Sequence, residues 1–415
     1  MKIALDSIGC KLNQAEIESL GKQFAAAGHR LVTLPDEADV YILNTCTVTH
    51  IADRKSRHLL RLAHRRNPAT CLVAIGCFAE RASGDLAQID GVKLVLGNEQ
   101  KPRLLQILEE NGYLKRDMHL TSRGQDGTSR RTRALVKIQD GCNNFCAYCI
   151  VPLVRRGEKS VPVAQIIDEV KQRAAAGYQE VVLTGTEIGS YNDEGIGLRG
   201  LLERVLAEND VSRLRLSSLQ PQGISSELVE LWRNDRLCPH FHLSLQSGSD
   251  AVLKWMKRRY SAVNYQKAVS LIRQMVLGVA ITTDIIVGFP GETEAEFEES
   301  YDFCRRMRFA RIHVFPYSPR PRTEAAQMPE RVGEKVKRRR CQRMLALAEE
   351  SSVKFMQEFE GMILPVLWEQ KAGGLWSGLT CNYIRVYAKS NDDLTNKVLP
   401  TKLLEVWGKG MWGAV

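Results

Sequence analysis

Little in this 415-residue sequence would place the protein in a membrane or outside the cell. No apolar run approaches the roughly 20 residues that cross a bilayer as a helix. The N-terminal stretch MKIALDSIGC has one lysine and a short apolar run that Asp6 interrupts, so it lacks the apolar core of a signal peptide. We therefore expect a cytoplasmic protein with no membrane partner. There, its eleven cysteines are core residues, metal ligands or catalytic thiols rather than disulfides.

The sequence also lacks internal repeats, low-complexity tracts and any Ser/His/Asp or paired-carboxylate arrangement that requires a catalytic interpretation. What it does have is positive charge. The formal net charge is +10, and the excess gathers in blocks such as Asp53–Arg66 and Lys335–Arg343. Such blocks favour a polyanion partner, most commonly nucleic acid, although any single block is equally compatible with a solvated helix face.

The first hundred residues alternate between short apolar strands and helical segments. KIALDSIG, DVYILNT and CLVAIG are strand candidates, and Asn13–Ala26 has helical character. This alternation predicts a parallel sheet with helices on its faces. We expect an N-terminal open parallel α/β sheet over residues 1–115, followed by a polar, Gly/Ser/Arg-rich linker over residues 116–133.

The alternation then resumes with longer spacing. Six strand candidates follow, namely RALVKIQ, EVVLTG, RLRLSSL, HFHLSLQ, TTDIIVGF and RIHVFPYS. Six β/α units predict a central partial (β/α)6 TIM-like barrel over residues 134–357, in which reactive residues gather at the C-terminal ends of the strands. Short strand-like runs separated by glycines predict a small all-β module over residues 358–415. The fold class is thus α/β with several domains.

Three cysteines, Cys142, Cys146 and Cys149, lie within eight positions after the first barrel strand. A zinc site would usually need paired ligands, and no second pair stands nearby. Three soft thiolates instead suit a 4Fe-4S cluster whose fourth iron is open. An open iron can bind the amine and carboxylate of S-adenosylmethionine. The spacing, with Tyr148 before the last cysteine, resembles the signature of the radical S-adenosylmethionine (radical SAM) superfamily.

A second set of cysteines is dispersed in sequence. Cys10, Cys46 and Cys77 each follow or end a predicted strand of the N-terminal sheet. Because the carboxyl ends of parallel strands meet at one edge of an open α/β sheet, these three thiols should converge there. The alternative for any one of them is a buried core residue. The other five show no such placement and are expected to be structural: Cys71, Cys238, Cys304, Cys341 and Cys381.

The sequence is similar to the methylthiotransferase family of radical SAM enzymes over nearly its whole length. The resemblance is carried by GCKLNQAEIES, YILNTCTVTHIADRKSR, IGCFAER, GCNNFCAYCIVPLVRRG, LTGTEIG, RLSSLQP, HLSLQSGSDAVLKWMKRRY, DIIVGFPGETEAEFEES and HVFPYSPRPRTEAAQMP. It implies that Cys10, Cys46 and Cys77 hold a second 4Fe-4S cluster, and that residues 358–415 form a TRAM module that binds RNA. It also implies transfer of a methylthio group to an unactivated carbon. One cluster then generates a radical, and the other presents sulfur within bond-forming reach.

Within that family, NTCTVTHIADRKSR is similar to the branch that acts on threonylcarbamoyladenosine in tRNA. The resemblance implies a 2-methylthio product at the adenosine 3′ of the anticodon, made with two molecules of S-adenosylmethionine. A base in that unpaired loop can be stacked and read by a protein. The chemistry implies a one-electron donor, such as a flavodoxin or ferredoxin, and a sulfur source. Two other substrates are alternatives, namely isopentenyladenosine in tRNA and an aspartate of a ribosomal protein. A third alternative is that the protein is a metal-stabilised RNA-binding protein without catalysis.

Other residues are candidates for binding S-adenosylmethionine or RNA. Gly185 and Thr186 would let the backbone approach the methionyl amine, unless they only form a strand-to-helix turn. Ser217, Ser218 and Gln246 would bind its ribose and carboxylate, unless they are ordinary polar rim residues. The remaining candidates pair with an acidic group or interleave aromatic and basic character in the β module: Arg155, Arg156, Trp376, Tyr383, Arg385 and Tyr387. For Trp376 a place in the core is an equal alternative.

Two positions depart from the family pattern. Gln220 stands where a glutamate is common, and Arg322 stands where a glycine is usual. Neither is a predicted cluster ligand, so the departures bear on the contacts to S-adenosylmethionine and RNA rather than on the reaction.

Overall fold

The computed structural model of the chain describes residues 1–114 and 132–415. The predicted linker, residues 116–133, lies outside the described residues except for Thr132 and Arg133. Arg133 already begins the first strand of the central unit. Among the described residues, no helix combines the length and the apolar character that crossing a bilayer requires.

The front unit is a five-stranded parallel sheet in the order β2-β1-β3-β4-β5. Its strands are β1 (Lys2–Ser7), β2 (Arg30–Val32), β3 (Val40–Thr45), β4 (Cys71–Gly76) and β5 (Val92–Leu96). Its helices are α1 (Lys11–Ala26), α2 (His50–Arg66), α3 (Cys77–Arg81), α4 (Ser83–Ala87) and α5 (Leu104–Glu110). Helices α1 and α5 cover one face, and α2, α3 and α4 cover the other.

The predicted open parallel sheet is therefore confirmed, and the central strand shows why. Every residue of β3, VYILNT, is buried, as expected for a strand with helices on both faces. Strands β2 and β5 are absent from the sequence-based prediction. The first has only three residues, and the second is mostly half-buried, so neither gives a clear apolar run.

The central unit contains the predicted partial barrel. Its parallel strands are β6 (Arg133–Lys137), β9 (Glu180–Thr184), β12 (Arg213–Leu216), β13 (Ser218–Leu219), β14 (His240–Leu243), β15 (Ala280–Val287) and β16 (Arg311–Pro316). They form the sheets β12-β9-β6 and β13-β14-β15-β16, because the predicted strand RLRLSSL breaks at Ser217 into β12 and β13. Two-residue strands β7 (Gln139–Asp140), β8 (Lys159–Ser160), β10 (Asn192–Asp193) and β11 (Ile196–Gly197) decorate the loops.

Helices cover the outer face of this curved sheet. They are α7 (Val163–Ala175), α8 (Leu198–Glu208), α9 (Ser226–Val229), α10 (Asp250–Trp255), α11 (Ala262–Met275), α12 (Glu294–Met307) and α13 (Glu334–Gln357). The short helix α6 (Val151–Val154) instead packs against Cys77 of the front unit. Capping boxes at Ser261 and Thr293 fix the starts of α11 and α12. We call the opposite, concave side the inner face.

The C-terminal unit is a closed five-stranded barrel in the order β17-β18-β19-β21-β20, so the predicted small β barrel is confirmed. Its strands are β17 (Ile363–Ala372), β18 (Leu375–Thr380), β19 (Arg385–Ala388), β20 (Val398–Trp407) and β21 (Gly410–Ala414). Trp368 and Trp376 fill its core together with Val386 and Met411.

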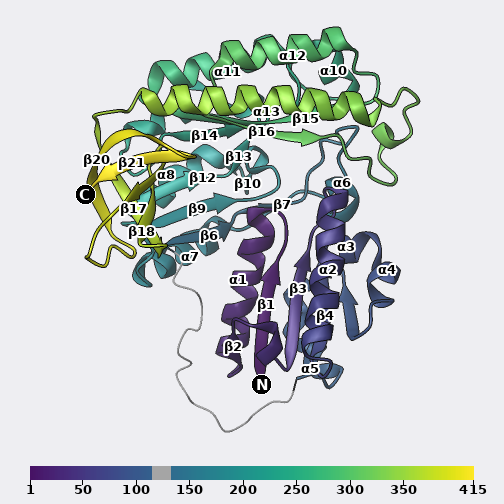
Figure 1. Ribbon diagram of the computed structural model, residues 1–415. Coiled ribbons are helices and arrows are strands. Elements are labelled where there is room, and N and C mark those ends of the chain that lie inside the picture. Colours follow the sequence, from purple (N-terminus) through teal and green to yellow (C-terminus); the bar gives the residue numbers. More distant parts are fainter. Residues whose placement is uncertain (115–131) are drawn as a thin grey trace.

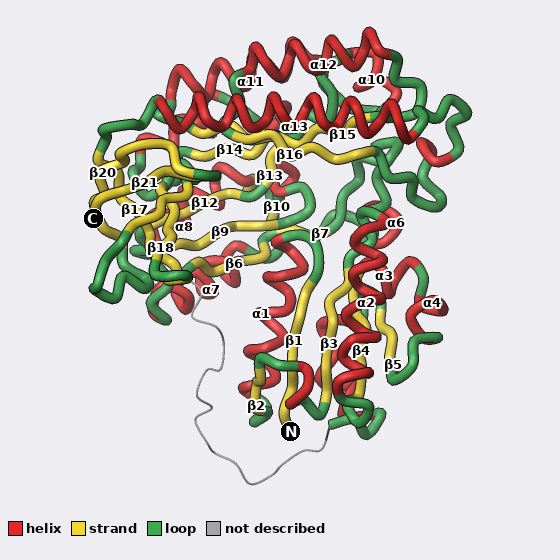
Figure 2. The backbone as a smooth tube through the Cα atoms, in the orientation of Figure 1, coloured by secondary structure: helices red, strands yellow, loops and turns green. Residues whose placement is uncertain are grey.

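The three units meet around the inner face (Figures 1 and 2). Ala15 of α1 packs against Leu135 of β6 and Val182 of β9, so the front unit lies beside the first barrel strand. The C-terminal β barrel contacts the amino-terminal ends of the central strands. There Arg133, the first residue of β6, donates to Glu369 of β17 at 2.9 Å. The C-terminal strand ends, which carry the predicted site, therefore face away from the β barrel.

Candidate functional site

The structure brings Cys10, Cys46 and Cys77, which we call the front triad, to the carboxyl edge of the front sheet. Cys10 precedes α1, Cys46 follows β3, and Cys77 begins α3 directly after β4. Their thiols lie close enough to influence one another electrostatically. Gly9 has φ +99°, and a Cβ there would lie 2.7 Å from the Cys46 sulfur, so this approach requires glycine.

Asn13 holds two of these loops together from the first turns of α1. Its side-chain amide donates to the carbonyl of Ile8 at 2.8 Å and to that of Thr45 at 3.1 Å. These carbonyls immediately precede the segments that carry Cys10 and Cys46. The front triad is thus positioned by tertiary contacts between neighbouring strands.

The remaining cysteines lie elsewhere. Cys71 begins β4, at the opposite edge of the sheet from Cys77. Cys304 is fully buried in α12, and Cys341 belongs to α13. Cys238 and Cys381 meet where the central unit contacts the β barrel.

Cys142, Cys146 and Cys149, the middle triad, occupy one loop between β7 and α6. Gly141 starts this loop with φ +75°, and a Cβ there would lie 1.6 Å from the carbonyl oxygen of Gly157. The amide of Cys149 donates to the carbonyl of Cys146 at 2.9 Å, which forms a tight turn. This triad is therefore shaped mainly by its own backbone.

Polar side chains that the sequence analysis missed surround the middle triad. Asn144 Nδ2 donates to the Cys142 sulfur at 3.3 Å, and Arg258 Nη1 donates to the Cys146 sulfur at 3.3 Å. Glu187 accepts hydrogen bonds from Asn144 and Gln220, and burial raises its pKa to about 7. Glu187 could have been noticed in LTGTEIG, next to two predicted residues, whereas Arg258 lies 112 residues from Cys146 and gives no local signal.

The predicted residues for S-adenosylmethionine lie at the carboxyl ends of successive barrel strands. A Cβ at Gly185 would lie 2.8 Å from the carbonyl oxygen of Gln139, so the loop after β9 needs glycine. Thr186 donates its backbone N–H to Gln139 Oε1 at 3.0 Å. Ser217 and Ser218 stand at the break between β12 and β13. Gln246 has φ +73°, and its backbone pairs with β15.

The donor sets fit 4Fe-4S clusters and an organic ligand beside the middle triad. Each triad offers three unbridged thiols. Burial raises the pKa of Cys46 and Cys149 to about 12, but coordination to a metal deprotonates a thiol outright. Within the described part of the chain, the hydroxyls of Thr186 and Ser217 are buried without a hydrogen-bond partner, as expected of groups that await a polar ligand.

Tyr148 and the aromatic candidates of the β module lie in different environments, some buried and some exposed. Tyr148 packs against the apolar cluster that includes Ala147 and Phe289. Trp376 is only 4% exposed, so its alternative place in the core is the one observed. Tyr383 stacks on His240 with ring centroids 4.7 Å apart and thus joins the β barrel to the central unit. Tyr387 packs edge-on against Trp407, which is 44% exposed.

The two basic blocks and the unusual Arg322 also have structural explanations. In the second block, Arg340 binds Glu292 at 2.9 Å, and Arg343 binds Glu298, so this charge serves largely to attach α13 to its neighbours. The first block forms α2, most of whose basic side chains are exposed. Arg322 has φ +66°, which is the left-handed conformation that favours glycine.

Family comparisons agree with this geometry. Residues 136–304 match the radical SAM superfamily, and residues 2–97 match an uncharacterised protein family, UPF0004. A half-open parallel barrel that carries three closely spaced cysteines after its first strand, together with this match, defines a radical SAM enzyme.

Curated relatives indicate to which family of radical SAM enzymes the chain belongs. The chain is 34% identical to the threonylcarbamoyladenosine tRNA methylthiotransferase MtaB of Bacillus subtilis (strain 168), over 97% of this chain and 94% of the relative. It is 37% identical to MtaB of Aquifex aeolicus (strain VF5), over 88% and 92%. It is also 34% identical to a tRNA-2-methylthio-N(6)-dimethylallyladenosine synthase of Syntrophotalea carbinolica, over 96% of each. The chain belongs to the methylthiotransferase family of radical SAM enzymes, whose cofactors are S-adenosylmethionine and 4Fe-4S clusters.

Solved structures share the fold. The radical SAM methyltransferase TsrM from Kitasatospora setae aligns with a TM-score of 0.58 at 16% identity, over 78% of this chain and 75% of that one. The cobalamin-dependent radical SAM enzyme OxsB aligns with a TM-score of 0.51 at 11% identity, over 84% and 56%. At these identities the likeness concerns the fold alone.

Proposed function

We propose that the protein is a tRNA methylthiotransferase that acts on C2 of threonylcarbamoyladenosine, next to the anticodon. The Bacillus and Aquifex relatives carry this activity in their names, whereas the Syntrophotalea relative is named for dimethylallyladenosine, another name for isopentenyladenosine. The substrates share an adenosine and differ in the N6 substituent. One substituent ends in a carboxylate, and the other is a branched hydrocarbon.

The observation that carries the proposal is the polarity of the inner face. Along β14, β15 and β16 the outward residues, such as Phe241, Ile285 and Ile312, join the apolar core beneath the helices. The alternate residues point to the inner face and include His242, Asp284 and His313, whose ligand atoms all lie within 4.8 Å of one another. His242 and Asp284 already pair with each other at 3.1 Å, but a hydrocarbon substituent against this polar face would displace water without offering a hydrogen bond in return.

Positive charge also gathers on this face. Burial is the main cause that lowers the pKa of His313, and the charges of His242, Arg311 and Lys11 lower it further, although Asp284 opposes them. Lys11 directly follows Cys10, and its Nζ lies 5.7 Å from the centre of the Tyr383 ring, so it reaches the β-barrel end of the inner face, where Arg311 begins β16. A carboxylate would bind favourably to Arg311 and Lys11 through charge-assisted hydrogen bonds.

In this function each triad holds one 4Fe-4S cluster, Cys142, Cys146 and Cys149 beside S-adenosylmethionine and the front triad for sulfur transfer. When bound, the clusters and S-adenosylmethionine supply the radical and sulfur chemistry. Tyr148, Gly185, Thr186, Ser217, Ser218 and Gln246 surround S-adenosylmethionine at the carboxyl ends of the strands. The units are residues 1–115, 134–357 and 358–415, joined in part by the linker 116–133. An external one-electron donor, such as a flavodoxin or ferredoxin, and a sulfur source act in the cytoplasm.

The β barrel offers a surface for the tRNA. Tyr387, Trp407 and Trp412 form an edge-on aromatic cluster, and the exposed Lys409 lies in the turn between β20 and β21. Aromatic rings that stack on bases, beside cations that meet phosphates, are typical of single-stranded RNA binding.

The deciding experiment is nucleoside mass spectrometry of tRNA from a strain that lacks the gene. We expect the 2-methylthio form of threonylcarbamoyladenosine to disappear and to return with the wild-type gene. An unchanged amount would contradict the tRNA function and favour the ribosomal-protein aspartate, whereas loss of the isopentenyl derivative would contradict the threonylcarbamoyl assignment.

Anticodon stem-loops that carry either nucleoside test the inner face directly. We expect Arg311→Leu to lower kcat/KM for the threonylcarbamoyl substrate by about tenfold or more, as for a lost hydrogen bond to a charged group. Arg306→Leu on the outer helix α12 removes the same charge and should leave kcat/KM unchanged. Equal values for Arg311→Leu and wild type would contradict the role of Arg311.

A further inference from the structure

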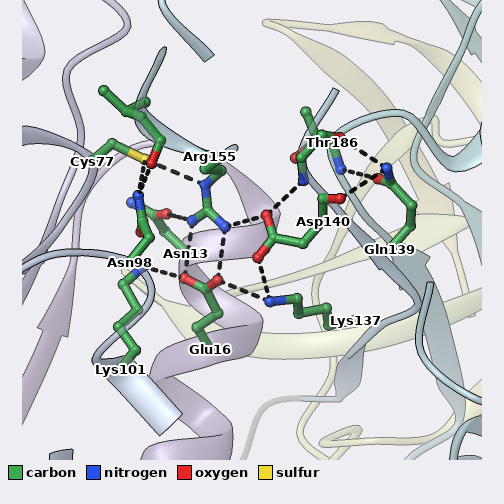
Figure 3. Close-up of polar contacts among 12 residues, drawn as sticks. Asn13, Glu16, Cys77, Asn98, Lys101, Lys137, Gln139, Asp140, Arg155 and Thr186 are labelled. Carbon is green, nitrogen blue, oxygen red and sulfur yellow. Dashed lines mark hydrogen bonds and ion pairs between the residues drawn. The ribbon is translucent and has the colours of Figure 1, made fainter. Parts of the chain in front are cut away.

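Arg155 lies between the segments that carry the two triads, and its side chain is saturated with hydrogen bonds (Figure 3). Its Nε donates to the Cys77 sulfur at 3.3 Å. Its Nη1 donates to Glu16 at 2.8 Å and to Asp140 at 2.7 Å, and its Nη2 donates to Asn13 at 2.8 Å and to Glu16 at 3.0 Å. A guanidinium has five N–H donors, and each has an acceptor here. The side chain is only 3% exposed.

These acceptors belong to the segments that carry the cysteines. Asn13 and Glu16 lie in α1, just after Cys10, and Asn13 also holds the loops of Cys10 and Cys46. Asp140 accepts from the backbone N–H of Gly141 at 2.8 Å, immediately before Cys142. Arg155 itself follows the middle loop at the end of α6. The side chain of Arg155, which itself follows the middle loop, therefore joins Asp140 before that loop to Asn13 and Glu16 beside the front triad.

The charges around Arg155 leave an excess of positive charge beside Cys77. Glu16 also binds Lys101 at 2.6 Å and Lys137 at 3.3 Å, and Lys137 binds Asp140 at 2.6 Å. Arg155 and the two lysines thus face two carboxylates. A buried ionic network of this kind costs desolvation energy, so it is weak evidence for stability alone. A donor to a ligand sulfur, in contrast, changes how readily an iron–sulfur cluster accepts an electron.

We propose that Arg155 is a positioning residue that fixes the front cluster relative to the middle cluster and raises the reduction potential of the front cluster. The positive charge and the N–H directed at Cys77 stabilise the extra electron of the reduced cluster. The hydrogen bonds from the guanidinium to Asn13, Glu16 and Asp140 fix the position of the two cluster-bearing loops relative to each other. The proposal rests on the assignment of the front cluster to Cys10, Cys46 and Cys77, but not on the identity of the nucleoside.

The potential of the front cluster can be measured by itself in the full-length chain. In a background with Cys142→Ala, Cys146→Ala and Cys149→Ala, redox titration followed by electron paramagnetic resonance reports only the front cluster. We expect Arg155→Gln to change the ratio of oxidised to reduced cluster at a fixed potential by about tenfold toward the oxidised form, which equals about 59 mV for one electron.

Arg156→Gln is the matched control, because it removes the same charge one residue along the chain from an exposed position. We expect Arg156→Gln to titrate like the parent. Arg155→Lys keeps the charge but cannot reach all the acceptors at once, so it should shift the potential in the same direction by less. This variant also serves if Arg155→Gln does not fold.

A second measurement reports the positioning role with both triads intact. We expect Arg155→Lys to raise severalfold the amount of 5′-deoxyadenosine released per methylthiolated product, because S-adenosylmethionine is cleaved while sulfur is poorly placed. An unshifted potential in the folded Arg155 variants, together with a wild-type ratio of products, would overturn the proposal. If the triple-alanine background bound no iron, the front-cluster assignment would fall and this proposal with it.

Discussion

The two cysteine triads offer the same ligands but are built in different ways. The middle triad lies within eight positions of one loop, which Gly141 and a turn from Cys146 to Cys149 shape. The front triad is assembled from three strand ends up to 67 residues apart, which Asn13 and Arg155 hold together. The middle triad is therefore a local structure, whereas the front triad depends on the whole front sheet and on its contact with the central unit.

The carboxylates beside the two triads also differ, because different physical causes determine their pKa values. Burial acts to raise the pKa of Glu16, but Lys101 and Arg155 hold it well below its usual range. Near the middle triad, burial dominates and raises the pKa of Glu187 to about 7, although the hydrogen bond from Gln220 opposes this. The interface around the front triad thus relies on fixed charges, and the pocket beside the middle triad contains a group that can gain or lose a proton.

The largest expected effect separates the two triads by their products. Cys46→Ala and Cys146→Ala should each abolish methylthiolation and leave about four of about eight irons, since each triad holds one 4Fe-4S cluster. Only Cys46→Ala should still release 5′-deoxyadenosine, because the middle triad remains. Iron and sulfide analysis with mass spectrometry of both products tests this, and product from either variant would contradict the assignment.

The next effect is on stability. Glu16→Gln breaks a buried ionic network and should lower the free energy of unfolding by about 3–5 kcal/mol. Because Glu16 is ionised in both the folded and the unfolded protein above about pH 5, this loss should stay nearly constant from pH 5 to pH 7.5. Anaerobic thermal melts of the complete protein at several pH values measure it. A loss that vanished at pH 5 would contradict the low pKa.

The effect of Glu187→Gln on the free energy of unfolding, unlike that of Glu16→Gln, should depend on pH. Between the unfolded pKa near 4.5 and the folded pKa of about 7, the folded protein binds more protons than the unfolded one. Wild-type stability therefore falls as pH rises through this window, by about 3 kcal/mol relative to Glu187→Gln, and is constant above it. The same melts should show the two proteins diverging from pH 5 to pH 7.5, whereas parallel curves would contradict the raised pKa.

The contrast between the triads also explains what could be predicted from the sequence. The middle triad has a fixed short spacing, and the front triad repeats a simple pattern of cysteines at strand ends, so both could be found without coordinates. The alternation of strands and helices likewise predicted the open sheet and the six-stranded partial barrel. Strand β2 was missed because Arg30–Val32 is too short for a pattern to form.

The surrounding residues could not be found in this way, because their roles arise from contacts between distant segments. Arg258 reaches Cys146 across 112 residues, and Arg155 reaches Asn13 across 142. Tyr383 and Trp376 have the composition of an RNA-binding strand, but one joins two units and the other fills a core. The alternation of apolar and polar residues along a strand does not indicate which face another unit will cover. For this reason nothing in the sequence indicated that Trp407 would be exposed.

A smaller effect compares one polar support beside each triad. Asn13→Ala removes donors to two buried carbonyls and should cost about 1–3 kcal/mol, with iron lost from the front triad. Gln139→Ala removes the acceptor of the backbone N–H groups of Thr186 and Glu187 and should weaken binding of S-adenosylmethionine by about tenfold, or 1.4 kcal/mol. Iron analysis and equilibrium binding measure both. Iron loss from the front triad in Gln139→Ala would show that the two supports are not separate.

The smallest effect compares two asparagines that donate to cluster ligands. Asn144 Nδ2 lies 3.3 Å from the Cys142 sulfur, whereas Asn98 Nδ2 lies 3.7 Å from the Cys77 sulfur and donates more closely, at 2.6 Å, to the carbonyl of Val154. Since a hydrogen bond weakens with distance, Asn144→Ala should make the potential of the middle cluster more negative by less than about 59 mV. Asn98→Ala should shift the front cluster less still, because Arg155 continues to donate to the same sulfur. Redox titration of each variant checks the order, and a larger shift from Asn98→Ala would mean that Asn98, rather than Arg155, governs the electrostatics of Cys77.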